Sequence, residues 1–175
     1  MAERRYIFEV VTAAVEEVSP EHLTVREMVL MNARLKGSAV AELHPDALVV
    51  AADTLVARDG QALGKPASLD EARAMLGSLA GRTHEVFSGV WIEHRAANFR
   101  ESFVEVSQVH FRSLTQADIE DYLQRVHVLD KAGAYAAQDD PIGLIQLIEG
   151  SRTNVIGLPI ERLEEILGKR GCLVI

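Results

Sequence analysis

The sequence has few of the features that mark specialised classes of protein. Its single cysteine, Cys172, excludes an internal disulfide and fits a reducing compartment. Its longest apolar stretches, such as Ala47 to Ala52, are far too short to span a bilayer. The first residues contain no apolar core after the arginines and do not resemble a signal peptide. We therefore expect a cytoplasmic protein with no membrane-spanning segment.

Basic clusters and the best-known nucleotide motifs are also absent. The net charge is −8, and no run of Lys and Arg with interleaved aromatics is present, which argues against a nucleic-acid surface. There is no Walker A loop, no GxGxxG and no GxSxG motif. The six histidines show no HxH or HxxxH spacing, which argues against zinc. Oxygen ligands for magnesium or manganese, and a small phosphorylated ligand, remain compatible with this composition.

The composition is that of one globular domain. A chain of 175 residues, 48% hydrophobic and 25% charged, supports a single core, so we expect one domain over residues 1–175. Helical and strand-like segments alternate, with antiparallel hairpins between them. This order predicts an α/β fold with a mixed central sheet, flanking helices and a long antiparallel ribbon.

Periodicity and capping signals place the individual elements. Thr24 and Glu27 form a capping-box pattern at the start of a helix that reaches Leu43. The continuously apolar run from Ala47 to Ala52 predicts a strand buried on both faces. The remaining pattern predicts strands at 6–11, 86–94, 99–111 and 144–148, a hairpin at 55–63, and helices at 68–79, 115–126 and 159–168.

Three short motifs could contribute to chemistry. Asp53-Thr54 is predicted at the carboxyl end of the buried strand, where ligands gather in open α/β sheets, but a turn or cap aspartate is an equally good interpretation. Gly64-Lys65-Pro66 places a lysine just ahead of a helix N-terminus, which suits an anion, although such a tripeptide is usually only a turn. The segment from Asp130 to Gly133 joins a charge pair to small residues and is uninformative alone.

Taken in order, these motifs resemble one family. Asp53-Thr54, Gly64-Lys65-Pro66, residues 81–86 with Ser88-Gly89, residues 130–135 and residues 157–159 are similar to motifs of the Maf-like nucleoside triphosphate pyrophosphatases. The resemblance runs from about residue 8 to 167. It implies a fold related to that of the inosine triphosphatases, a single Maf-like domain and a homodimer. It also implies hydrolysis of a nucleoside triphosphate to the monophosphate and pyrophosphate, with Mg²⁺ or Mn²⁺.

The same resemblance implies roles for the charged residues. Asp53 matches the catalytic aspartate, whose carboxylate acts as the general base for the attacking water and contacts the metal. Glu17 matches a second metal ligand. Lys65 matches the phosphate-binding lysine, and Lys36 matches a lysine that the family keeps before its Asp-Thr strand and is expected to bind substrate. Lys131 could reach phosphate or simply pair with its neighbouring aspartate. From spacing alone, Lys36 would be a solvated helix lysine. Cations are needed at such a site because a triphosphate repels a nucleophile until its charge is spread.

The resemblance assigns the choice of base to Thr54 and Gln138. The Asp-Thr pairing is similar to the branch that acts on dTTP and UTP. An alternative for Gln138 is a cap on the turn before Pro141. Asp139 stands where the family has a glycine, which adds negative charge beside the expected base pocket.

The beginning of the chain departs from the family pattern. Family members start with an apolar strand and a Ser-x-x-Arg-Arg loop, which we cannot align ahead of Tyr6, so we expect an N-terminally shortened domain. This leaves two alternatives for function. One is a catalytically weak, nucleotide-binding regulator linked to cell division. The other is a house-cleaning phosphatase for modified or purine triphosphates, which Asp53-Thr54 disfavours.

Overall fold

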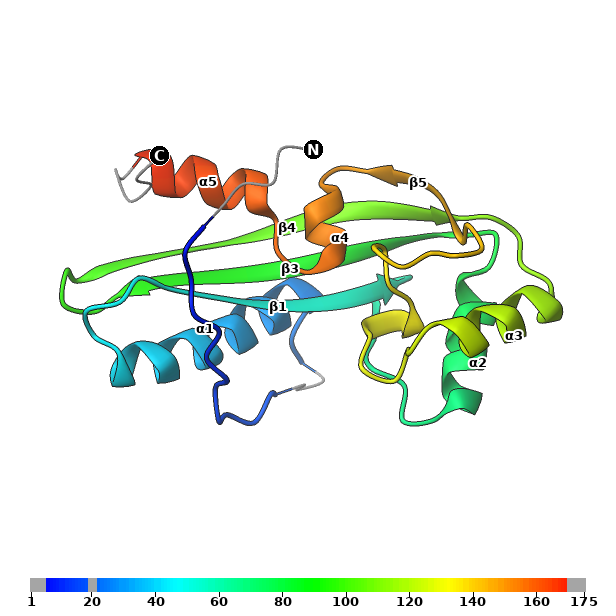
Figure 1. Cartoon of the computed structure of the whole chain (residues 1–175), viewed down its shortest axis with the longest axis horizontal. Helices are drawn as coiled ribbons and strands as arrows, with labels where there is room; N and C mark the ends of the chain where they lie inside the picture. The colour runs from blue at the N-terminus through cyan, green and yellow to red at the C-terminus, as the bar shows by residue number, and fades with distance from the viewer. Residues whose placement is uncertain (1–5, 19–21, 170–175) are drawn as a thin grey trace.

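A five-stranded sheet forms the centre of the structure, a computed structural model that describes residues 6–18 and 22–169 (Figure 1). The strands run in the order β2–β1–β3–β4–β5. Their bounds are β1 Val49–Arg58, β2 Gln61–Leu63, β3 Thr83–His94, β4 Phe99–Phe111 and β5 Ile145–Glu149. The α/β class with flanking helices is confirmed. Every pairing among these described strands is antiparallel, where the sequence predicted a mixed sheet.

The two longest strands of this sheet form the antiparallel ribbon. Strands β3 and β4 pair along their full lengths, from Thr83 opposite His110 to His94 opposite Phe99. The turn between them contains Asn98 at a φ of 47°, a left-handed conformation that asparagine tolerates well. The ribbon predicted from residues 86–94 and 99–111 is therefore confirmed, with a few more residues at one end.

Strand β1 differs from its prediction in length. It begins at Val49 and continues to Arg58, pairing with β3 from Val49 through Ala57. The expectation that the strand ends at Asp53-Thr54 is therefore wrong, because the two polar residues lie in its middle. Leu55 to Ala57 continue the ladder with β3, and this pairing outweighs the tendency of aspartate to end a strand.

Helix α1, Val25–Leu43, packs on one face of the sheet as predicted. Its capping box is present, since the Glu27 carboxylate accepts from the Thr24 backbone and the Thr24 hydroxyl accepts from Glu27. A Cβ placed on Gly89 of β3 would lie 2.5 Å from the carbonyl carbon and oxygen of Val29. Only glycine at this position lets the helix backbone rest directly on the sheet.

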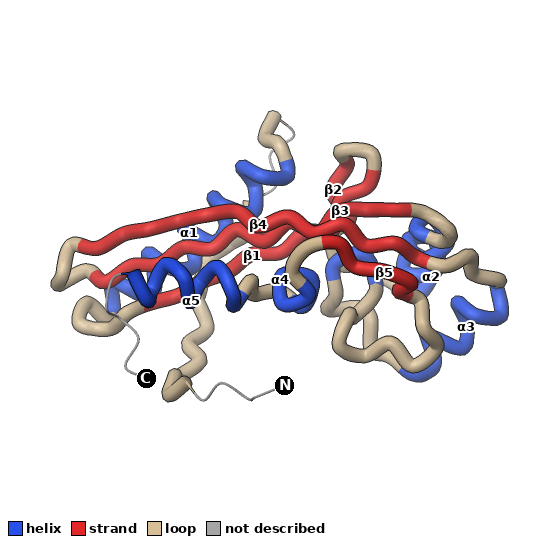
Figure 2. The backbone as a smooth tube through the Cα atoms, turned by 90° about the horizontal axis from the view of Figure 1, so that it is seen from above, coloured by secondary structure: helices blue, strands red, loops and turns tan. Residues whose placement is uncertain are grey.

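The opposite face of the sheet carries helices α4, Arg152–Ile156, and α5, Ile160–Lys169 (Figures 1 and 2). Pro159 lies immediately before α5 rather than inside it. The sequence did not predict α4, which is too short to show a helical period. The buried side chains of the cluster between the sheet and α5 are Val90, Ile92, Phe103, Leu163 and Leu167.

Helices α2, Leu69–Leu79, and α3, Gln116–Arg125, pack together at one end of the sheet (Figure 1), where they share a core with Val56, Val86 and Val109. A short 3₁₀ turn, η1, spans Ala132–Ala134 between α3 and β5. Both helices begin at the predicted caps, Ser68 and Thr115. None of the described helices combines the length and apolar character that crossing a membrane requires.

The predicted strand at Tyr6 to Val11 is wrong. Residues 6–18 adopt no regular secondary structure, and they run from the α5 side of the sheet to the α1 side (Figure 1). Ile7, Phe8 and Val10 are largely exposed. A β-branched run forms a strand only where another strand offers backbone partners and a surface to pack against, and this segment pairs with none of the described strands.

A buried histidine lies in the core between the sheet and the 3₁₀ turn. His84 is 2% exposed, and its ring contacts Phe111 and Tyr135 edge to face. The Tyr135 hydroxyl lies 2.9 Å from its Nε2. Burial, with a smaller contribution from His110, lowers the pKa of His84 to about 4. The imidazole is therefore neutral in the folded protein near neutral pH.

This lowered pKa predicts a loss of stability in mild acid. As the pH falls below about 6.5, the unfolded chain takes up a proton at His84, whereas the folded chain does so only near pH 4. The free energy of unfolding should fall across this window by up to about 3 kcal/mol through this group. Urea unfolding of His84→Gln at pH 5 and pH 8 should show a smaller pH effect than the native chain. The exposed His22→Gln should keep the native pH effect, and equal slopes in all three proteins would contradict the assignment.

Candidate active site

One cavity of about 510 Å³ brings the predicted site residues together. Strand β1 pairs with β2 only through Val56–Arg58, so part of its outer edge is unpaired among the described strands. The cavity is lined by residues on both faces of β1 near this edge. All the predicted site residues line it: Glu17, Lys36, Asp53, Thr54, Lys65, Lys131 and Gln138.

Lys36 bridges two carboxylates on the α1 side of the cavity. Its Nζ lies 2.7 Å from Oε1 of Glu17 and 2.7 Å from Oδ1 of Asp53. Asp53 is 8% exposed, whereas the Glu17 side chain is half exposed. A buried carboxylate is costly without a counter-charge, and the ammonium supplies it here. Lys36 is therefore not the solvated helix lysine that its spacing alone suggested.

The protonation of this group of three follows from its contacts. The hydrogen bond from Lys36 lowers the pKa of Glu17, with a smaller opposing effect of burial. Burial by itself would lower the pKa of Lys36, but its bonds to Asp53 and Glu17 outweigh this and raise the pKa. Near neutral pH, Lys36 is charged and Glu17 is ionised.

Asn32, one helical turn before Lys36, was missed by the sequence analysis. Its Nδ2 donates to Oδ2 of Asp53 at 3.3 Å and to the Val18 carbonyl at 3.1 Å, and its Oδ1 accepts from the Val18 N–H at 2.9 Å. The available signal was a polar residue on the apolar face of α1, four residues before Lys36. That spacing places both side chains on one face of the helix.

Thr54 points to the other face of β1, as alternation along a strand requires. Its Oγ1 lies 2.7 Å from Oγ of Ser88 and 3.2 Å from the carbonyl oxygen of Gly157. Ser88 is fully buried and donates to the Asn154 carbonyl of α4. The hydroxyl of Thr54 is thus held by the motifs at 88–89 and 157–159, which the sequence did not place together.

Two loops carry the remaining lysines. The Gly133 N–H in η1 donates to the Gly64 carbonyl at 3.0 Å, which joins the loop of Lys65 to that of Lys131. Gly133 has a φ of 68°, and a Cβ there would lie 3.0 Å from Val56. Glycine at this position therefore permits both the turn and the close packing. Lys131 pairs with Asp130 at 2.9 Å, the second of its two predicted interpretations, while still lining the cavity.

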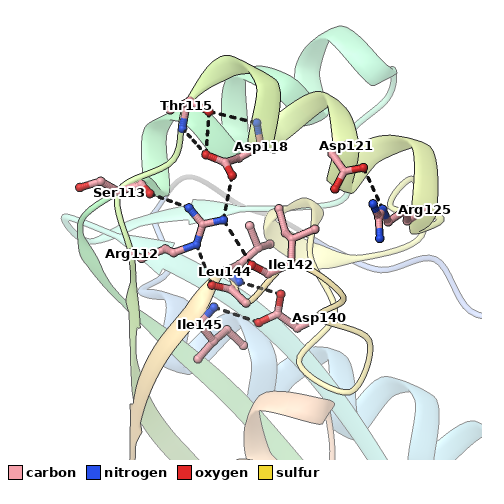
Figure 3. A network of polar contacts seen from close by, with 11 residues as sticks. Arg112, Ser113, Thr115, Asp118, Asp121, Arg125, Asp140, Ile142, Leu144 and Ile145 are labelled. Carbon is pink, nitrogen blue, oxygen red and sulfur yellow. Dashed lines mark hydrogen bonds and ion pairs between the residues drawn. The ribbon is translucent and has the colours of Figure 1, made fainter.

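Gln138 is exposed where it lines the cavity, and the loop after it is firmly anchored (Figure 3). The Asp140 carboxylate accepts from the N–H groups of Leu144 and Ile145 at 2.7 and 3.0 Å. Arg112 bonds the carbonyls of residues 142 and 143 and also the Asp118 carboxylate, whose pKa it holds well below its usual range. The loop is thereby tied to the start of α3 and to β5.

Residues 1–170 match the family described as Maf-like protein. The chain belongs to the Maf-like family. It is 42% identical over 164 residues to a dTTP/UTP pyrophosphatase of Pelotomaculum thermopropionicum, covering 94% of this chain and 86% of that protein. Proteins of the same name from Akkermansia muciniphila and Halalkalibacterium halodurans are each 40% identical over 164 residues, with 94% of this chain covered and 86% and 85% of the relatives.

The donors in this Maf-like cavity suit a divalent cation that is shared with a substrate. Within residues 6–18 and 22–169 no group of three or more His, Cys, Asp or Glu could hold a metal unaided. Glu17 and Asp53 supply two carboxylates. Mg²⁺ is typically held in this way by one or two carboxylates, with phosphate oxygens and water completing its coordination. The residues therefore fit Mg²⁺ or Mn²⁺ bound together with a nucleotide.

The bridging ammonium predicts how a Maf-like variant without it would behave. Lys36→Met should leave Asp53 buried without its counter-charge and lower the free energy of unfolding by about 1–3 kcal/mol. This loss is smaller than that expected for a fully buried ion pair, because Lys36 and Glu17 are partly exposed to solvent. Thermal and urea unfolding measure this loss.

Lys65→Met is the matched control, since Lys65 lines the same cavity but has no ion pair among the described residues. Equal stability of the two variants would contradict the structural role of Lys36.

Proposed function

We propose that this protein hydrolyses nucleoside triphosphates, with dTTP and UTP preferred, to the monophosphate and pyrophosphate. The observation that carries the proposal is the grouping of Asp53, Glu17 and Lys36 in one cavity with Lys65 and Lys131. This grouping offers carboxylates for a base and a cation, and lysines for a polyphosphate. The names of the Maf-like relatives support the same reaction and the same two substrates.

The proposed reaction is attack of water on the α-phosphorus. The new bond joins the water oxygen to that phosphorus, the bond to the bridging oxygen breaks, and pyrophosphate leaves with the electron pair. Asp53 accepts the proton of the water, and its burial beside Lys36 keeps the carboxylate in one orientation. Lys65 and Lys131 offset the charge of the departing pyrophosphate.

We further propose that Glu17 and Asp53 hold Mg²⁺ or Mn²⁺ when the nucleotide is bound. Such a cation supplies charge neutralisation at the phosphates. The two carboxylates and their position in the cavity support this assignment. Lys36, which stays charged between them, reduces their mutual repulsion before a nucleotide arrives.

Selection of the base is assigned to Thr54 and Gln138. The Thr54 hydroxyl lines one side of the cavity, and its contacts with Ser88 and Gly157 fix its orientation. Gln138 is exposed at the cavity, and its amide can both donate to and accept from the edge of a pyrimidine. These two features support a preference for thymine and uracil.

A homodimer and a cytoplasmic location complete the proposal. The family resemblance supports the homodimer, and sedimentation of the purified chain measures it directly. The single cysteine in the sequence supports a reducing compartment.

Asp53→Asn should abolish turnover while the fold and nucleotide binding persist. The substitution keeps the shape of the side chain but removes proton acceptance and a metal-attracting charge. Pyrophosphate release from UTP with Mg²⁺ or Mn²⁺ measures the rate, and calorimetry measures nucleotide binding. Lys65→Ala is the comparison: it should raise KM and lower kcat, because the phosphates are charged both in the bound substrate and in the transition state. Unimpaired pyrophosphate release by purified Asp53→Asn would exclude Asp53 as the base.

Gln138→Ala should reduce the preference for pyrimidine nucleotides. Removing the amide removes its hydrogen bonds to the base, so the ratio of kcat/KM for UTP over GTP should fall by roughly tenfold. Gln124→Ala is the matched control, since it removes an exposed amide of α3 that does not line the cavity. An unchanged ratio in Gln138→Ala would show that the nucleobase binds elsewhere in the cavity.

A further inference from the structure

Asn32 is a buried amide whose hydrogen-bonding groups are all engaged. It is 4% exposed and lies on α1 among the buried apolar residues Met28, Val29 and Ala33. Placing an amide at such a position is unfavourable unless each polar group has a partner. Asn32 has three such bonds, and all of them are made to two segments that carry predicted site residues.

The first of these segments is the one that carries Glu17. Asn32 accepts from the Val18 N–H at 2.9 Å and donates to the Val18 carbonyl at 3.1 Å, so one amide side chain holds both polar groups of one residue. Residues 6–18 have no helix or strand to fix them. The two bonds to Val18 therefore set the position of the backbone next to Glu17.

The second segment is the middle of β1. The remaining N–H of Asn32 points to Oδ2 of Asp53 at 3.3 Å, while Lys36 bonds Oδ1 of the same carboxylate. Asp53 is thereby held at both oxygens from one helix. Asn32 and Lys36 are four residues apart on α1. Both bond Asp53, and they reach the segment of Glu17 in different ways: Lys36 at the Glu17 carboxylate and Asn32 at the backbone of the next residue, Val18.

We propose that Asn32 is a positioning residue that fixes Glu17 and Asp53 in one mutual geometry for catalysis. The inference rests on the proposed function for its effect on turnover. Lys36 alone cannot supply this order, because its long side chain adapts to many arrangements of two carboxylates. The short amide of Asn32 has fewer rotatable bonds, and its three hydrogen bonds leave it one orientation.

The distinguishing experiment uses Asn32→Leu and Asn32→Asp in the full chain. Leucine keeps the branched shape and suits the apolar surroundings, so the melting temperature should fall no further than in the control. The kcat for UTP should nevertheless fall on the order of 10- to 100-fold, as expected when reacting groups are misplaced, with KM changed less than about threefold. Ser38→Ala is the matched control, since it removes a part-buried hydrogen bond from α1 to Glu93 without touching the cavity.

Hydrogen exchange at the Val18 amide tests the clamp directly. Exchange should accelerate by roughly tenfold in Asn32→Leu, which has no acceptor, and stay near the native rate in Asn32→Asp, whose carboxylate still accepts the N–H. Both variants lose the donation to Asp53, so both should lose turnover. This pattern separates the hold on Val18 from the hold on Asp53.

The outcomes distinguish this inference from the proposed function. Native kcat in Asn32→Leu, or native exchange at Val18, would overturn the positioning role. A fall in melting temperature and kcat matched by Ser38→Ala would show a purely structural role and also overturn it. If the native chain releases no pyrophosphate from any triphosphate, the proposed function fails. The exchange measurement then still decides whether Asn32 holds the segment of Glu17.

Discussion

The direct contact between α1 and the sheet is the constraint on which the rest of the site depends. Gly89 stands opposite Asp53 in the β1–β3 ladder, and the backbone of Val29 rests where a side chain at Gly89 would be. This close approach brings the next turns of α1 within hydrogen-bonding distance of β1. Asn32 and Lys36 reach Asp53 only because no side chain separates the helix from the sheet.

The second organising feature is the distribution of charge around β1. An acidic chain with a net charge of −8 places two carboxylates beside Lys36 and lets Lys65 and Lys131 line the same cavity. The lysines suit a polyphosphate, while the acids suit a cation and a base. Thr54 follows Asp53 in β1, so its side chain points to the opposite face of the strand. The charged Asp53 carboxylate and the uncharged Thr54 hydroxyl therefore lie on opposite sides of β1.

The sequence predicted most of the helices and both strands of the ribbon, because caps and apolar periodicity act locally. Thr24 and Glu27 specify the start of α1 without help from distant residues. The failures have a different cause. The apolar run at Tyr6 to Val11 has the composition of a strand but no partner strand among the described residues, and the ladder with β3 carries β1 past Asp53.

The sequence by itself determined which residues are available for chemistry: the ordered motifs named Asp53, Lys65 and Lys131, and their resemblance to a family supplied expected roles. Only the tertiary structure decided how these residues meet. In the sequence, Asn32 is marked only as a polar residue on the apolar face of a helix, and that pattern does not identify its partners. Its importance arises from bonds to Val18 and Asp53, which lie 14 and 21 residues away along the chain. Hydrogen bonds of this range depend on the packing of α1 against the sheet, which no local pattern encodes.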